Sequence, residues 1–260
     1  MTYTTISLES DNGCHRLTLD RQDRLNSLSA QMQEEIAHAL SAIEAEAPRV
    51  LLITGAGRAF CAGQDLGERD VEAGDLDLGQ GPELYYNPLV RRLTALPCPV
   101  VCAVNGVAAG AGVNIALACD IVVAKRSARF VQAFSAIGLV PDAGGTWHLP
   151  RLMGQARALG FTLLGETLTA PDAQAAGLIW RAIDDETFDD EVNGLVSRLA
   201  VAPTSGLAAA KRAIRGTWTA TLDEALDLER DLQRTCGRSH DYKEGVTAFK
   251  AKRKPAFKGH

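Results

Sequence analysis

The 260-residue sequence has no apolar run long enough to cross a membrane. Its opening segment, MTYTTISLESDNG, lacks the basic and apolar regions of a secretory signal peptide. Cys-x-x-Cys pairs and closely spaced histidines, the usual marks of a zinc site, are also missing. There is no excess of basic charge, and the net charge of -5 argues against non-specific nucleic-acid binding. We therefore expect a cytoplasmic protein that uses no metal and binds neither membranes nor nucleic acids.

The composition is that of an ordinary globular protein, with 46% hydrophobic and 23% charged residues, and it is sufficient to bury a large core. The six cysteines are Cys14, Cys61, Cys98, Cys102, Cys119 and Cys236, and most of them stand within apolar strand or helix patterns. Such positions are typical of small buried residues in a reducing compartment, not of a disulfide framework.

Strand and helix patterns alternate through residues 1–202, and only helical patterns follow. Strands are expected at residues 3–9, 14–20, 50–54, 99–104, 120–124 and 178–183. Helices are expected at residues 29–46, 85–96, 113–119, 151–164, 169–176 and 188–200, and then at 206–217, 222–236 and 241–252. Residues 67–88 are rich in Gly, Asp and Glu without periodicity, which is typical of a functional or mobile loop. The pattern predicts an α/β core at residues 1–202 and a helical subdomain at residues 203–260.

The segment 105–147 contains the most informative pattern. A buried strand ends at Asn105-Gly106, and Gly110-Ala111-Gly112 then leads into an apolar helix. Backbone N–H groups at such a helix start have no partner within the helix, and small side chains let a ligand approach them. They suit a carbonyl oxygen that becomes negative during reaction. Because the turn 141–145 displays one carboxylate, Asp142, the segment indicates proton chemistry next to a carbonyl.

Four segments carry a family resemblance: LLITGAGRAFCAGQDL, PVVCAVNGVAAGAG, LACDIVVA and EGVTAFKAKRKPAF. They occur in the same order along the whole chain in the enoyl-CoA hydratase/isomerase (crotonase) superfamily, which this sequence therefore resembles. The resemblance implies a spiral of ββα repeats, C-terminal helices that trimerise, and an acyl-CoA thioester substrate, with CoA as part of the substrate and no separate cofactor. It also implies an oxyanion hole formed by the backbone N–H groups of Ala62 and Ala111.

The carboxylates point to the reaction. Hydratases of this superfamily carry two glutamates, and the matching positions here are Asn114 and Phe134. Neither residue can act as a general base at neutral pH, so hydration is not expected. Asp142 stands where several isomerases of the superfamily keep an aspartate. In isolation, an Asp between Pro and Gly-Gly is more often a turn or capping residue, but the thioester context favours catalysis.

Longer segments, among them SAIGLVPDAGGTWHLPR and LDLERDLQRTCGRSHDYKEGV, are similar to one branch of the superfamily. That branch converts the ring epoxide of phenylacetyl-CoA to its oxepin form in bacterial phenylacetate breakdown, and also isomerises Δ3- to Δ2-enoyl-CoA. Two alternatives stay open at this point. One is a general Δ3,Δ2-enoyl-CoA isomerase of fatty-acid oxidation, and the other is a non-catalytic binding protein with the same fold.

The resemblance also implies where CoA and the acyl group bind. The matching positions are Arg24, Leu25, Gln64, Asp65 and Leu66 near the adenosine, and Phe249 and Lys252, often from another subunit, near the adenine and phosphates. Tyr86, Asn114 and Phe134 are expected beside the acyl group, although packing explains Tyr86 equally well. Similarly, Lys252 has a simpler explanation as a solvated helix end. The implied partners are further copies of the chain, as a trimer or a dimer of trimers, and a pathway hydratase or dehydrogenase.

Overall fold

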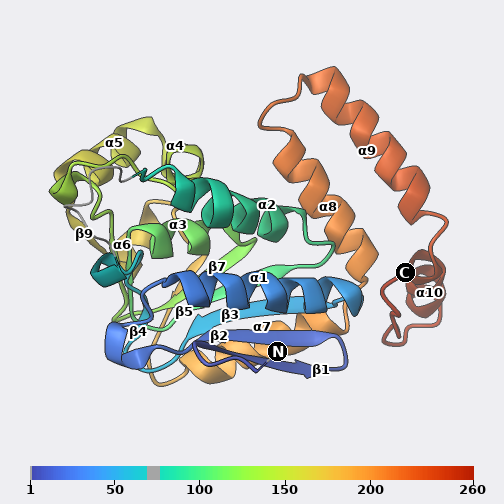
Figure 1. The fold of residues 1–260 in the computed structure, drawn as a ribbon. Coiled ribbons are helices and arrows are strands. Elements are labelled where there is room, and N and C mark those ends of the chain that lie inside the picture. Colours follow the sequence, from blue (N-terminus) through green and yellow to red (C-terminus); the bar gives the residue numbers. More distant parts are fainter. Residues whose placement is uncertain (1, 69–76) are drawn as a thin grey trace.

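The computed structural model describes residues 2–68 and 77–260, and part of the irregular loop expected at 67–88 lies outside them. Within these residues the strands form two sheets (Figure 1). The larger sheet has the order β1 (Ile6–Asp11), β2 (Cys14–Leu19), β3 (Val50–Gly55), β5 (Val100–Val104), β7 (Ile121–Lys125) and β10 (Arg181–Ile183). The smaller sheet has the order β4 (Ala59–Cys61), β6 (Val107–Ala109), β8 (Arg129–Val131) and β9 (Thr167–Thr169). Pairing is parallel except between β1 and β2 and between β8 and β9.

Consecutive strands alternate between the two sheets. β3, β5 and β7 belong to the larger sheet, and the strand that follows each of them, β4, β6 or β8, belongs to the smaller one. A helix comes after each pair: α2 (Asn87–Ala95), α3 (Ala111–Ala118) and α4 (Gly145–Met153). The expected α/β spiral of ββα turns is therefore confirmed, although no repeat is visible in the sequence.

The larger sheet is buried on both faces. Leu51 and Ile53 of β3 belong to the core cluster under α1 (Ala30–Ala45) and α3, whereas Val50 and Leu52 pack with α7 (Phe188–Ala200) on the opposite face. A parallel sheet covered on both sides needs continuous apolar strands, which explains why these segments show no alternation. This core holds the ends of β3, β5 and β7 in fixed positions.

Local signals in the sequence set several element boundaries. Asn12 and Gly13 both have positive φ, 50° and 79°, as the tight turn between β1 and β2 requires. The Ser29 side chain caps α1 by accepting from the Met32 N–H at 3.1 Å. The single helix expected at 151–164 is wrong, because Gly154 (φ 80°) ends α4 and α5 (Gln155–Leu164) starts after it. The strand expected at 178–183 is confined to β10.

The C-terminal helices are α8 (Thr204–Gly216), α9 (Leu222–Cys236) and α10 (His240–Lys250). Helix α8 is attached to the core through Asp120, whose carboxylate lies 2.8 Å from Lys211 and 2.9 Å from Arg215. Helices α9 and α10 extend away from the sheets to one end of the molecule (Figure 1). The remaining helix, α6 (Ala170–Ala175), is short and lies beside β9.

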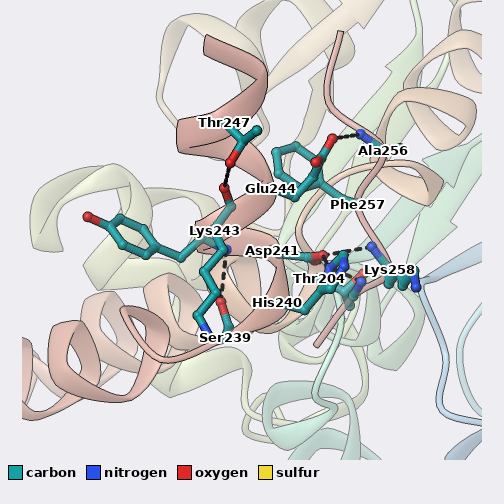
Figure 2. Close-up of polar contacts among 12 residues, drawn as sticks. Thr204, Ser239, His240, Asp241, Lys243, Glu244, Thr247, Ala256, Phe257 and Lys258 are labelled. Carbon is teal, nitrogen blue, oxygen red and sulfur yellow. Dashed lines mark hydrogen bonds and ion pairs between the residues drawn. The ribbon is translucent and has the colours of Figure 1, made fainter. Parts of the chain in front are cut away.

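The last residues fold back onto α10 (Figure 2). Buried Asp241 accepts the N–H groups of Lys258 and Gly259, each at 2.7 Å. Burial opposes ionisation of Asp241, but these two bonds outweigh it and lower the pKa of the carboxyl. Glu244 forms a two-bond ion pair with Arg253 at 2.6 and 2.8 Å. The tail is therefore fixed to α10. Across the described part of the chain, every helix is too short or too polar to span a membrane.

Candidate active site

Helix α3 begins at Ala111, earlier than the expected residue 113, and its first turn contains the first candidate donor. Gly110 precedes the helix with φ 52°, and no side chain caps it. The first N–H groups of a helix have no acceptor within the helix. Within the described residues, the Ala111 N–H makes no hydrogen bond to the protein. It is therefore available to a ligand such as a carbonyl oxygen.

The second predicted donor, Ala62, is not available. Its N–H donates to the Leu25 carbonyl at 3.0 Å, so the prediction for Ala62 is corrected. The next residues pair with Leu28 as in a parallel sheet: the Leu28 N–H donates to Gly63 at 2.8 Å, and the Asp65 N–H donates to Leu28 at 3.1 Å. In this pairing the residue between the two bonds, Gln64, directs its own N–H away from Leu28.

Gly63 brings the Gln64 N–H close to α3. A Cβ atom on Gly63 would lie 2.8 Å from the Ala109 carbonyl and 3.4 Å from the Ala111 nitrogen, and φ is +87°. Only glycine tolerates both this contact and this φ. In the described part of the chain the Gln64 N–H has no protein acceptor. Gln64 and Ala111 are thus the two neighbouring backbone donors.

The turn that carries Asp142 is attached to the same helix. The Asp142 carbonyl accepts from the Gly145 N–H at 2.8 Å and from the Asn114 side chain at 2.9 Å. Asn114 lies one helical turn beyond Ala111, so the turn is held beside the start of α3. Asp142 as a whole is partly exposed, unlike its buried neighbours Pro141 and Ala143, although its Oδ1 atom is buried. The turn that carries Asp142 is therefore fixed to the helix whose first turn holds the Ala111 donor.

Asn114 and Phe134 occupy the positions of the two missing glutamates, and the structure gives them different surroundings. Asn114 is fully buried, and both ends of its amide are engaged, by the Asp142 carbonyl and by Gln132 at 2.7 Å. The predicted contact of Asn114 with substrate is corrected, because the side chain lies behind the turn. The Phe134 ring lies near the helix start, since a Cβ on Gly110 would be 3.7 Å from it. It provides an apolar wall there.

Tyr86 closes a short π-helix, Pro82–Tyr86, that leads into α2. Its side chain is buried, and its hydroxyl donates a hydrogen bond to the Gln64 side chain. π-Helical turns occur frequently at functional sites. The bond fixes the loop that holds the Gln64 backbone donor, so a packing role for Tyr86 is supported by direct contact.

The residues expected near adenosine come together in two adjoining loops. Arg24 and Leu25 follow β2, and Gln64, Asp65 and Leu66 follow β4. An ion pair between Arg21 and Asp65, at 2.9 Å, connects the loops. Burial opposes ionisation of Asp65, but hydrogen bonds from Arg21 and the Gly67 N–H lower the pKa of its carboxyl. Leu66 is half-exposed and Arg24 is exposed, so both can contact a ligand.

Phe249 and Lys252 are not part of this group. They lie at the end of α10, on the side of the molecule opposite β4 (Figure 1). The Phe249 side chain is 85% exposed, and Lys252 is exposed with a φ of 52°. Within one chain, α10 therefore lies apart from the loops that carry the other predicted CoA residues (Figure 1).

His148, in the first turn of α4 and six residues after Asp142, is buried next to the turn that carries Asp142. A Cβ on Gly144 would lie 3.2 Å from its ring. Burial lowers the pKa of His148 to about 4, and the charges of Arg215 and Arg151 act in the same direction. The imidazole is therefore neutral near pH 7. Over the described ranges, no three His, Cys, Asp or Glu side chains gather as metal ligands.

Two residues of the site were missed from the sequence. Gln64 was assigned to adenosine and not to the oxyanion, although its position after a glycine resembles the sequence around Ala111. Gln132 was not singled out at all. It is a polar residue within the apolar run FVQAF, and a buried amide in such a run needs a polar partner.

The comparisons with known proteins concern the whole chain. The sequence model of the enoyl-CoA hydratase/isomerase family matches residues 9–260. The 1,2-epoxyphenylacetyl-CoA isomerase of Escherichia coli (strain K12) is 56% identical over 252 residues, 96% of each chain. The 2,3-dehydroadipyl-CoA hydratase of the same strain is 37% identical over 244 residues, 94% of each chain. The crystal structure of an enoyl-CoA hydratase from Bacillus anthracis has a TM-score of 0.91 at 32% identity, covering 99% of this chain and 100% of that one. The chain belongs to the enoyl-CoA hydratase/isomerase family.

Proposed function

We propose that the protein is an acyl-CoA isomerase that converts 1,2-epoxyphenylacetyl-CoA to its oxepin form and also isomerises Δ3- to Δ2-enoyl-CoA. One arrangement carries the proposal: the turn of Asp142 is bonded to helix α3, whose Ala111 N–H lies beside the Gln64 loop, while Asn114 and Phe134 replace both glutamates of the hydratases. The 56% identity to a 1,2-epoxyphenylacetyl-CoA isomerase supports the choice of substrate.

Both reactions begin with the same proton transfer. The thioester oxygen accepts hydrogen bonds from the Gln64 and Ala111 N–H groups, and Asp142 removes a proton from the carbon next to the thioester. In the Δ3-enoyl substrate the double bond then moves by one position, and Asp142 returns the proton to the far carbon. In the ring epoxide the C–C bond shared by the epoxide and the six-membered ring breaks, both C–O bonds are kept in the resulting seven-membered oxepin, and the proton is returned to a ring carbon. No atom is gained or lost in either case.

The direct test offers the pure protein both thioesters in deuterated water and follows product mass. We expect an oxepin product from the epoxide and a Δ2 product from 3-hexenoyl-CoA. Turnover of 3-hexenoyl-CoA alone would favour the general fatty-acid isomerase. Absence of turnover with either thioester would favour a binding protein and would contradict the proposal.

The first prediction concerns water. The wild-type protein should hydrate crotonyl-CoA far more slowly than a two-glutamate hydratase, because Asn114 is engaged behind the turn and the Phe134 ring makes its side of the site apolar. A hydratase needs carboxylates that orient and activate water. The measurement is loss of crotonyl-CoA absorbance, with a two-glutamate hydratase as positive control. Hydration at the rate of that control would contradict the prediction.

We also propose that the CoA site is completed by a second copy of the chain in a trimer, with residues 203–260 as the oligomerisation region. Phe249 and Lys252 stand at the end of α10, which lies across the molecule from β4 (Figure 1), and α9 exposes Leu222 and Leu226, 73% and 51% of their surface. Exposed leucines on a helix that extends from the core are typical of subunit contacts. Lys252 then supplies a cation to a CoA phosphate of the neighbouring subunit.

The second prediction tests this arrangement by mixing two defective subunits. Lys252→Ala should raise KM for acyl-CoA by about tenfold, the effect of losing one charge-assisted bond, and leave kcat nearly unchanged. Lys254→Ala, in the same tail, is the matched control. Mixed oligomers of Lys252→Ala and Asp142→Asn chains should regain sites with normal KM, because intact Asp142 and intact Lys252 come from different chains. If mixing restores nothing, the shared site is excluded.

A further inference from the structure

We infer that Asn114 and Gln132 are positioning residues that hold Asp142 in place for proton transfer. This inference rests on the proposed role of Asp142 as the base. Asn114 stands where hydratases carry a glutamate, yet here its side chain contacts the main chain of the catalytic turn. In place of a glutamate that would activate water, position 114 therefore carries an amide that holds the turn of Asp142.

The hydrogen bonds have a fixed direction. The Asp142 carbonyl can only accept, so Asn114 must present its NH2 group to it, at 2.9 Å. The oxygen of Asn114 is then directed to Gln132, which must present its own NH2 group, at 2.7 Å. Asn114 and Gln132 are both completely buried. Competition from water is therefore excluded, and each bond is stronger than it would be at the surface.

The turn needs such a support because its backbone is strained. Ala143 has φ 46° and Gly144 has φ 79°, and a non-glycine residue in this region is costly. The Gly145 N–H alone would leave the Asp142 carbonyl with a single local bond, and the Asn114 amide adds a second one from outside the turn. Asn114 also packs directly on Gly145, whose Cβ, if present, would be 2.4 Å from the amide nitrogen. The turn is thereby clamped to α3.

Helix α3 also carries the Ala111 donor, one turn before Asn114. The contacts of Asn114 with Asp142 and Gly145 therefore fix the distance between the Asp142 carboxylate and the thioester oxygen that Ala111 and Gln64 bind. A displacement of a catalytic group by about 1 Å from its substrate is enough to lower a rate by about a hundredfold. Because Asn114 and Gln132 are buried and cannot contact substrate, we expect their substitution to lower kcat and to leave substrate binding nearly unchanged.

The test uses isosteric substitutions in the full-length protein, with 3-hexenoyl-CoA as substrate. Asn114→Asp keeps the shape but replaces the donor with an acceptor, and we expect kcat to fall by about 10- to 100-fold with KM within about threefold. Gln132→Met should give a smaller fall in kcat. Gln33→Met, at another buried glutamine on α1, is the matched control and should leave kcat unchanged.

A double-mutant comparison separates positioning from general damage. If Asn114 acts through Asp142, Asn114→Asp should lower the residual rate of Asp142→Asn by less than about threefold. The inference is overturned if folded Asn114→Asp and Gln132→Met keep the wild-type kcat, or if Asn114→Asp is equally harmful in both backgrounds. If Asn114→Asp does not fold, Gln132→Met decides alone. Full activity of Asp142→Asn would instead contradict the proposed function, so the two failures are distinguishable.

Discussion

Ala111→Pro should lower isomerase kcat by about 100- to 1,000-fold, the usual effect of losing one oxyanion donor. Proline at the first position of a helix removes an N–H that has no acceptor within the helix, and its fixed φ suits that position. Gly110 precedes it with φ 52° and ψ -123°, a mirror-image extended conformation that the residue before a proline can adopt only if it is glycine. The substitution therefore deletes one donor while α3 stays in place.

The matched control is Ala111→Gly, which keeps the N–H and removes only a methyl group. We expect it to turn over 3-hexenoyl-CoA close to the wild-type rate. The thermal unfolding midpoint and the oligomer size of both variants show whether α3 is intact. A folded Ala111→Pro with normal kcat would mean that the thioester oxygen is stabilised by other groups.

The fold was largely predictable because its signals are local or periodic. Asn12-Gly13 sets a tight turn through the backbone angles of those two residues alone. The strand 100–104 is apolar throughout because both of its faces are covered. Such a continuous apolar run can be recognised in the sequence alone. The break at Gly154 was missed because an isolated glycine is compatible with a helix interior as well as with its end.

The site was predictable only in part, since backbone donors cannot be identified from side chains. Ala62 and Gln64 flank the same glycine, and the pairing with Leu28 decides which N–H is directed to α3. That pairing joins two loops far apart in the sequence, so no local pattern contains it. The hydrogen bonds that link Gln132, Asn114 and the Asp142 carbonyl also join separate segments of the chain, so no local pattern predicts them. By contrast, the family resemblance and the local sequence both point to Asp142 and Ala111, so the prediction of these two residues does not depend on a distant pairing.

The largest loss is expected at the base. Asp142→Asn should lower isomerisation by at least about a hundredfold, because an amide cannot accept the proton that the carboxylate removes. The turn should remain intact, since the bonds from Gly145 and Asn114 go to the main-chain carbonyl of residue 142 and not to its side chain. Acyl-CoA binding and thermal stability should therefore change little.

Exchange and chemical rescue distinguish a missing base from a distorted site. In deuterated water, wild-type protein should exchange the proton next to the thioester, and Asp142→Asn should lose this exchange together with turnover, because both need the same proton removal. Asp142→Ala leaves space beside the two backbone donors, so added formate should restore part of the rate by acting as a carboxylate in the vacated volume. Formamide has the same size without the charge and should restore nothing. If Asp142→Asn exchanges and turns over at the wild-type rate, another group removes the proton, and Asp142 serves only to shape its turn.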